Sequence, residues 1–220
     1  MAITKIRPYQ LFALDGRAPN DRDVNVQLPC RRGFGNLTLL ETFVLIAAVK
    51  AVGARRVFEF GTFLGATTLN LASNVARDGE VLTLDLGSEG GAAFQDPADV
   101  EISRTHFAAP AMDYVGSAVE AKITQLYGDS TKFDFSPWRG TADLVLIDGG
   151  HDLATVTADT RNAFELVNDQ SLAAVVWHDY ANPDYPELTV LLDELSEARS
   201  IYHVGDTMLC IWFSQPVRGL

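Results

Sequence analysis

Acidic residues and histidines follow two of the most apolar stretches of the chain. Asp148 and His151 come after residues 142–147, and His178 and Asp179 come after residues 173–177. Short, almost wholly apolar runs of this kind are typical of parallel strands that are buried on both faces. Adjacent strands lie about 4.8 Å apart. The four side chains therefore converge at one end of a sheet if the two strands are neighbours.

Carboxyl and imidazole groups that meet at the end of a strand are suited to proton transfer. An imidazole has an ordinary pKa of about 6.5, so it can take up a proton near neutral pH. His151, three residues after Asp148, is our candidate for such a base. The alternative is that His151 only supports Asp148 as a hydrogen-bond partner, and the sequence leaves it open.

A glycine-rich stretch over residues 55–68 predicts a strand, a tight turn and the start of a helix. Gly61 and Gly65 lie four residues apart, and Glu59 stands two residues before the first of them. Glycines let a ligand approach the backbone, and the free N–H groups of a helix start favour a negatively charged group. Ligands of open α/β sheets bind in such a crevice. Alone, the turn is a weak motif, since an ordinary strand-to-helix turn also uses glycine.

Two further acids lie at the ends of predicted strands. Asp85 ends the strand over residues 81–86, where an acid can accept hydrogen bonds from ribose hydroxyls. Its alternative role is to cap a helix or to lie in solvent. Asp129 follows the strand over residues 123–127 and is suited to accept a hydrogen bond from an exocyclic amine such as that of adenine.

The elements that must carry these residues alternate between strands and helices, which predicts an α/β domain. Residues 1–35 are interpreted as an irregular N-terminal arm and residues 36–220 as the domain itself. Asn36 is the expected N-cap of the first helix and Gly53 its stop. Residues 87–110 are expected to form a long loop that closes over the site. The other expected elements are helices over 64–76, 111–122, 153–167 and 185–198 and strands over 57–61, 201–204 and 208–213.

The composition fits one α/β domain. The chain has 220 residues, of which 47% are hydrophobic and 21% charged, and this length can bury a sizeable core. The formal net charge of -12 disfavours nucleic acid or an anionic membrane as partner, because such binding needs clustered Lys and Arg. Cys30 and Cys210 form no spacing motif, and the sequence shows no leader and no membrane-spanning apolar run. We therefore expect a cytoplasmic location and leave a homo-oligomer open.

Taken in order, these motifs resemble those of class I S-adenosylmethionine-dependent methyltransferases. The motifs are the glycine-rich turn, the strand ending in Asp85, Gly128-Asp129-Ser130, Ile147-Asp148-Gly149-Gly150-His151 and Trp177-His178-Asp179-Tyr180. The chain looks most like the small-molecule branch, which includes catechol-type and bacterial O-methyltransferases, over about residues 35–213. The resemblance implies a Rossmann-like, mostly parallel sheet of seven strands in the order 3-2-1-4-5-7-6, with the last strand antiparallel and helices on both faces. It also implies S-adenosylmethionine as cofactor and a small-molecule acceptor that is methylated on oxygen.

The resemblance also implies roles for particular residues. Those that match the cofactor-binding positions are Glu59, Gly61, Thr62, Phe63, Gly65, Thr67, Asp85, Leu86, Asp129, Ser130 and Asp148. The residues from Glu59 to Gly65 match the loop under the methionine part of the cofactor, and Thr67 matches a residue that can hold its carboxylate. Asp85 matches the ribose-binding acid. Asp148 and His151 match the family's catalytic pair, an Asp followed three residues later by the basic group that deprotonates the acceptor.

The resemblance further implies a metal site, with one departure from the usual pattern. His178 and Asp179 fall where metal-dependent members place two acids or an Asp-Asn pair, so the expected ligands are Asp148, His178 and Asp179. Mg²⁺ prefers oxygen ligands, whereas imidazole suits Mn²⁺, Fe²⁺ or Zn²⁺ better. The alternative is a histidine that is only hydrogen-bonded at a strand end. A second, peripheral departure is Asp169-Gln170-Ser171, where the family usually has Pro-Gly-Gly.

Two other functions stay open at this point. The first is a nicotinamide-dinucleotide-dependent oxidoreductase, although the Gly61–Gly65 spacing does not match G-x-G-x-x-G and Phe63 places bulk where a pyrophosphate must approach. The second is a non-catalytic cofactor-binding module on the same fold. Four aromatic residues either line an acceptor pocket or pack in the core. They are Phe135, Trp138, Trp177 and Tyr180.

Overall fold

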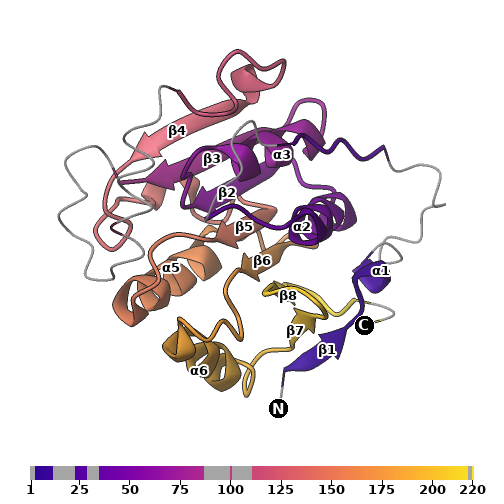
Figure 1. Ribbon diagram of the computed structural model, residues 1–220, viewed down its shortest axis with the longest axis vertical. Helices are drawn as coiled ribbons and strands as arrows, with labels where there is room; N and C mark the ends of the chain where they lie inside the picture. The colour runs from indigo at the N-terminus through magenta and orange to yellow at the C-terminus, as the bar shows by residue number, and fades with distance from the viewer. Residues whose placement is uncertain (1–2, 12–22, 29–34, 87–99, 101–110, 218–219) are drawn as a thin grey trace.

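The computed structural model describes residues 3–11, 23–28, 35–86, 100, 111–217 and 220. Within them, eight strands form one sheet in the order β1-β7-β8-β6-β5-β2-β3-β4, with helices on both faces (Figure 1). Strand β8 is antiparallel to β6 and β7, and the other neighbours are parallel. The Rossmann-like class and the antiparallel last strand are therefore confirmed. The strands are β1 (Thr4–Ile6), β2 (Arg56–Phe60), β3 (Glu80–Asp85), β4 (Ile123–Tyr127), β5 (Leu144–Ile147), β6 (Ala174–Trp177), β7 (Ile201–Val204) and β8 (Cys210–Phe213).

The strand count differs from the predicted seven because the N-terminal arm adds β1 at the edge of the sheet. The other seven strands keep the predicted order. Strand β1 pairs in parallel with β7, and the Gly205 N–H donates to the Ile6 carbonyl oxygen at 2.8 Å. Only Ile6 of its three residues is buried. So short a strand carries no alternating pattern, which is why the sequence did not reveal it.

The sheet separates two layers of hydrophobic core. Helices α2 (Leu39–Val52) and α3 (Ala66–Asn74) cover one face, and α5 (Leu153–Leu166) and α6 (Pro186–Leu195) cover the other (Figure 1). Successive strand residues alternate between the layers: Leu144 packs with α2 and α3, whereas Val145 packs with α5 and α6. Both faces of β5 and β6 are buried, so their polar residues come only where the strands end.

Two predicted helices differ in detail from the structure. Thr38, not Asn36, is the N-cap of α2, because its side chain and that of Glu41 form a reciprocal capping box, and Gly53 ends the helix in the left-handed conformation. The helix expected over residues 111–122 is mostly turns, with only a short 3₁₀ helix at Glu120–Lys122.

The arm also contacts the helix that follows the glycine-rich turn. The side-chain amides of Asn70 and Asn74, one turn apart on α3, pair with the backbone of Gln27 and Asn25 respectively. A short helix, α1 (Pro8–Leu11), follows β1. The division into an arm of residues 1–35 and a domain of residues 36–220 stays a prediction. The loop expected over 87–110 lies outside the described residues apart from Val100.

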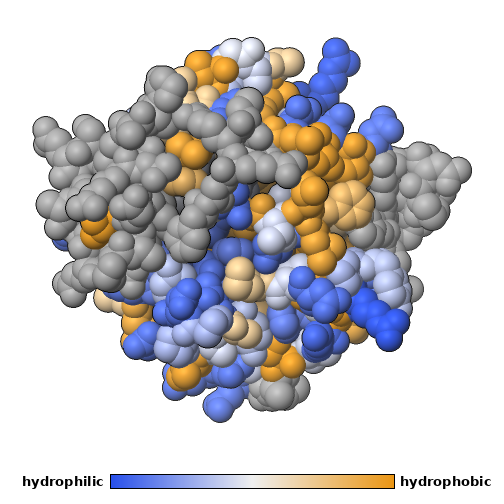
Figure 2. All heavy atoms as spheres, viewed as in Figure 1, coloured by the Kyte–Doolittle hydropathy of each residue, from blue (hydrophilic) through white to orange (hydrophobic). Residues whose placement is uncertain are grey.

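The surface of the described residues carries some exposed apolar side chains. Leu39, Leu40 and Phe43 at the start of α2 are exposed, and Figure 2 shows hydrophobic atoms in this region of the molecule. Among the described residues, no helix has the length and apolar character needed to cross a membrane.

Candidate active site

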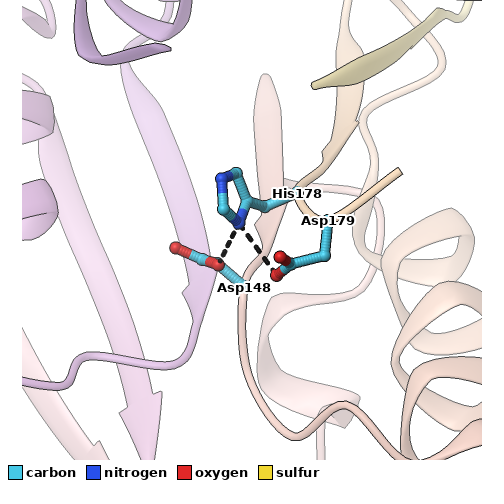
Figure 3. A group of neighbouring side chains, drawn as sticks. All are labelled: Asp148, His178 and Asp179. Carbon is cyan, nitrogen blue, oxygen red and sulfur yellow. Dashed lines mark hydrogen bonds and ion pairs between the residues drawn. The ribbon is translucent and has the colours of Figure 1, made fainter. Parts of the chain in front are cut away.

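The structure brings Asp148, His151, His178 and Asp179 together at the carboxyl end of the sheet. Strands β5 and β6 are adjacent and parallel, and the His178 N–H donates to the Ile147 carbonyl oxygen at 3.1 Å. This bond aligns the loops that follow the two strands. The side chains of Asp148, His178 and Asp179 consequently face one another (Figure 3).

Asp179 is the centre of this cluster. Its Oδ2 accepts hydrogen bonds from His151 Nε2 at 3.1 Å and from His178 Nδ1 at 2.9 Å, and its Oδ1 accepts one from Asn182 Nδ2 at 2.6 Å. Burial alone would raise the pKa of Asp179, but the two histidines outweigh it and hold this pKa well below its usual range. Its φ of 63° is left-handed, an uncommon conformation outside glycine that is found at functional sites. Asp179 is therefore a buried carboxylate with a fixed orientation.

His178 is surrounded by carboxylates. Its Nδ1 lies 3.2 Å from Asp148 Oδ1 as well as 2.9 Å from Asp179 Oδ2 (Figure 3), and its Nε2 lies 3.5 Å from Glu41 Oε1. Burial disfavours the charged ring, but the three carboxylates outweigh burial and raise the pKa of His178 far above its usual range.

Glu41 is a residue of this cluster that sequence reasoning missed. It is 2% exposed, and its Oε1 accepts a hydrogen bond from the Met208 N–H at 2.9 Å. Burial would raise the pKa of Glu41, but the neighbouring His178 ring and hydrogen bonds from Met208 and Thr38 lower it to about 2. The Thr38-x-x-Glu41 spacing marks a capping box in the sequence. It does not show that the same carboxyl group reaches the site.

Two residues fix the ring of His151, one by a contact at Nε2 and the other by stacking on its face. Its Nε2 contacts Asp179, and the ring stacks on Tyr185 with centroids 4.1 Å apart and planes inclined by 11°. A ring that donates from Nε2 to a carboxylate carries its lone pair on Nδ1, the atom that can take a proton. A carboxylate that fixes the tautomer and orientation of an imidazole is the arrangement of a general base. Tyr185, at the N-cap of α6, was also not predicted.

The geometry of Asp148, His178 and Asp179 fits a divalent metal ion. Each residue offers one ligand atom, and these atoms lie within 4.8 Å of one another. The separations of 2.9 and 3.2 Å between His178 Nδ1 and the two carboxylate oxygens suit neighbouring ligands of a small octahedral ion with bonds of about 2.1 Å. Two oxygens and one imidazole nitrogen suit Mn²⁺, Fe²⁺ or Zn²⁺ better than Mg²⁺.

The glycine-rich turn lies directly against the loop that carries Asp148. Gly61 has a φ of 91°, and a Cβ atom there would lie 2.0 Å from the Asp148 carbonyl oxygen. No side chain fits in this space, so Gly61 is required by a close approach of two backbones. The predicted cofactor turn and the predicted catalytic loop are therefore in contact.

Asp85 fixes the shape of the same turn. Its Oδ2 accepts hydrogen bonds from the backbone N–H groups of Thr62 at 2.9 Å and Phe63 at 2.8 Å, and its Oδ1 accepts one from Leu86 at 2.7 Å. Phe63 has a left-handed φ of 48°. The acid expected to bind ribose thus also holds two residues of the glycine-rich turn.

Glu59 lies beneath this turn in the core. It is fully buried and accepts a hydrogen bond from the Thr68 hydroxyl, and burial raises its pKa to about 8. Gly65 caps α3 with a φ of 83°, and a Cβ atom there would meet the Tyr114 ring at 2.7 Å. Thr67 is half-buried in the first turn of α3.

Asp129 and Ser130 form a turn after β4. Asp129 accepts hydrogen bonds from the Thr131 backbone and hydroxyl and pairs with Lys132 Nζ at 2.6 Å, and these contacts lower its pKa. The Ser130 carbonyl oxygen accepts a bond from Asn162 Nδ2 at 3.2 Å. In this structure the Asp129 carboxylate stabilises its own turn.

The four aromatic residues considered for an acceptor pocket are placed differently. Trp177 is fully buried, with its indole N–H donating to the Thr160 hydroxyl, and Phe135 is 5% exposed in the same core layer. Trp138 packs against that layer. The Tyr180 hydroxyl donates to Asp193. Core packing therefore accounts for Phe135 and Trp177.

Comparison with known proteins identifies one matching family model and several similar folds. Residues 58–180 match a family model described as a methyltransferase domain, and no curated protein matches the chain. An O-methyltransferase of Bacillus cereus in complex with SAH is 16% identical, with a TM-score of 0.58 over 82% of each chain. The O-methyltransferase TomG of Streptomyces achromogenes, which acts in tomaymycin synthesis and was solved with SAM, is 18% identical, with a TM-score of 0.53 over 80% of this chain and 81% of TomG. A putative caffeoyl-CoA O-methyltransferase of Staphylococcus aureus is 10% identical, with a TM-score of 0.60 over 81% of this chain and 84% of its own.

Proposed function

Because the chain belongs to the methyltransferase-domain family, we propose that it transfers the methyl group of S-adenosylmethionine to an oxygen atom of a small molecule. The observation that carries the proposal is the backbone contact between Gly61 and Asp148. It sets the turn expected under the methionine part of the cofactor beside the cluster that contains His151 and Asp179. The names of the similar structures, which are O-methyltransferases solved with SAM or SAH, support oxygen as the acceptor atom.

The cofactor would lie along the carboxyl ends of β2, β3 and β4. Glu59, buried below the turn, and the residues from Gly61 to Gly65 would hold its methionine part, and Thr67 its carboxylate. Asp85 and Leu86 would lie at the ribose, and Asp129 and Ser130 at the adenine. When bound, S-adenosylmethionine supplies a methyl group on a positively charged sulfur, and this sulfur is the group that the acceptor oxygen displaces from the methyl carbon.

His151 would accept the proton of the acceptor hydroxyl. Asp179 accepts a hydrogen bond from Nε2 of the ring, and in this tautomer Nδ1 is the basic nitrogen. The negative charge of Asp179 stabilises the imidazolium that forms, and Tyr185 fixes the plane of the ring. Asp148, beside both the turn and His178, would orient the acceptor.

A divalent cation is the second part of the proposal, and Asp148, His178 and Asp179 would hold it. Bound there, the cation would lower the pKa of the acceptor hydroxyl and orient the oxygen. The imidazole ligand favours Mn²⁺ over Mg²⁺.

The remaining partners follow from composition and family. A net charge of -12 favours a small-molecule acceptor over nucleic acid or an anionic membrane. The family match favours a methyltransferase over a nicotinamide-dependent oxidoreductase. A non-catalytic cofactor-binding module is disfavoured by the His151–Asp179 pair, which binding alone does not need.

The test uses S-adenosylmethionine with a labelled methyl group and a panel of phenols, catechols and aliphatic alcohols. We expect label in an O-methylated product, and turnover that a chelator abolishes and Mn²⁺ restores better than Mg²⁺. Turnover that resists the chelator would contradict the proposed role of a metal ion, but it would be compatible with His151 as the base. Cofactor binding without transfer to any acceptor would favour the non-catalytic module.

A further inference from the structure

Glu41 makes contacts beyond those of a helix cap. Its Oε2 accepts hydrogen bonds from the Thr38 N–H at 2.9 Å and the Thr38 hydroxyl at 2.7 Å, which completes the capping box of α2. Its Oε1 instead accepts the Met208 N–H at 2.9 Å and lies 3.5 Å from His178 Nε2. Capping boxes need only the first set of contacts. The second set ties a buried carboxylate to the loop before β8 and to the candidate metal cluster.

The chemistry of Glu41 and His178 indicates that Nε2 of His178 carries a hydrogen. An ionised carboxylate only accepts hydrogen bonds, so the ring nitrogen that faces it carries the hydrogen. Nε2 of His178 is buried, and none of the described residues forms a hydrogen bond with it. Glu41 Oε1 is the carboxylate oxygen that faces it. Without a cation, Nδ1 faces the Asp148 and Asp179 carboxylates and carries a hydrogen as well. A cation bound there would take the place of the Nδ1 hydrogen, and the ring would keep its hydrogen on Nε2.

We propose that Glu41 is a positioning residue that holds His178 in the Nε2–H tautomer and thereby presents Nδ1 to the divalent cation. The inference rests on the metal part of the proposed function. Metal-ligating histidines generally donate their second ring N–H to a carboxylate or carbonyl group, which fixes the tautomer and makes the ligand more basic. Glu41 has this position relative to His178, and the Met208 N–H, which donates to the same oxygen Oε1, keeps it there.

The experiment measures binding of Mn²⁺ alone to the full chain by calorimetry. Glu41→Gln removes the charge that faces His178, and loss of an outer partner of this kind typically lowers metal affinity about 10- to 100-fold. Thr38→Val is the matched control, because it disturbs the same capping box without touching His178. We expect Thr38→Val to lower the melting temperature while leaving Mn²⁺ affinity within about threefold of the wild type.

A second pair of variants tests whether Glu41 acts through the imidazole. His178→Asn offers an amide oxygen and has no ring tautomer to fix. In that background Glu41→Gln should have little further effect on Mn²⁺ affinity, so the two changes should not be additive. Full additivity would show that Glu41 acts elsewhere and would overturn the inference.

Other outcomes contradict the inference in distinguishable ways. Glu41→Gln with wild-type Mn²⁺ affinity, or Thr38→Val with an equal loss, would assign Glu41 to helix capping only. If the wild-type protein binds S-adenosylmethionine but not Mn²⁺, both this inference and the proposed metal site are wrong. The proposal of methyl transfer with His151 as base would then still stand. Wild-type protein that binds neither would overturn the proposed function as a whole.

Discussion

His151 Nε2 lies 3.1 Å from Asp179 Oδ2, although the residues follow two different strands. The contact exists because β5 and β6 are adjacent and in register at Ile147 and Trp177. The same Asp179 oxygen also accepts a bond from His178. One buried carboxylate therefore orients both the candidate base and a candidate metal ligand.

Replacing His151 with Ala should lower turnover by about 10²–10⁴, because the acceptor proton loses its base. Affinity for S-adenosylmethionine should change little, since the proton belongs to the other substrate. Steady-state kinetics with calorimetry on the same preparation check this. His203→Ala, which removes a histidine bonded to the Thr207 carbonyl oxygen, is the control. Full activity of His151→Ala would remove it from catalysis.

Replacing Asp85 with Ala should weaken cofactor binding roughly ten- to a hundredfold, the effect of losing hydrogen bonds worth about 1.5–3 kcal/mol to a charged group. The structure adds a second cause, because Asp85 also holds the N–H groups of Thr62 and Phe63. Calorimetry on folded Asp85→Ala protein measures the loss. An unchanged dissociation constant would exclude Asp85 from the site.

Replacing Gly61 with Ala should be far more damaging than the same change at Gly140. Both glycines have a left-handed φ, of 91° and 66°, but a Cβ atom at Gly61 meets the Asp148 carbonyl at 2.0 Å, whereas one at Gly140 has nothing within 4 Å. Gly140→Ala should cost about 1 kcal/mol for backbone strain. Gly61→Ala should cost clearly more and separate the turn from Asp148. Urea unfolding of both variants measures the difference, and equal losses would contradict the close approach.

Stability should fall as pH rises, partly because of Asp159. This carboxyl group is 1% exposed, and burial raises its pKa from 3.8 to about 7. The folded state therefore holds a proton that the unfolded state releases, so the stabilisation is full below the lower pKa and lost as pH rises through the higher one. At about 1.4 kcal/mol per pH unit, the loss across this window is at most about 4 kcal/mol.

Replacing Asp159 with Asn should remove that slope. Urea unfolding at several values between about pH 4 and pH 7 measures the free energy of unfolding. Asp169→Asn, at an exposed position, is the control and should keep the wild-type slope. A slope in Asp159→Asn equal to that of the wild type would show that other groups cause the pH dependence.

The sequence predicts those parts of the site that local patterns encode. Asp148, His178 and Asp179 were placed together because apolar runs mark buried parallel strands, and strand ends of one sheet share an edge. Gly61 was identified from the motif, although the reason for it, the Asp148 carbonyl, lies in a different loop.

The parts that the sequence does not predict depend on contacts between distant elements. The capping box marks Glu41 in the sequence. Its contact with His178, however, depends on how α2 packs against the residues after β6 and before β8. Tyr185 lies at the start of α6, and its stacking on His151 depends on the loop that precedes this helix. The edge strand β1 is too short for a periodic pattern.

The most direct test of the account is a calorimetric titration of the wild-type chain with S-adenosylmethionine, with its demethylated product and, separately, with NAD. We expect that the first two bind at one site per chain, that Asp85→Ala weakens the binding of both, and that NAD does not bind. Binding of NAD without binding of S-adenosylmethionine would contradict the account.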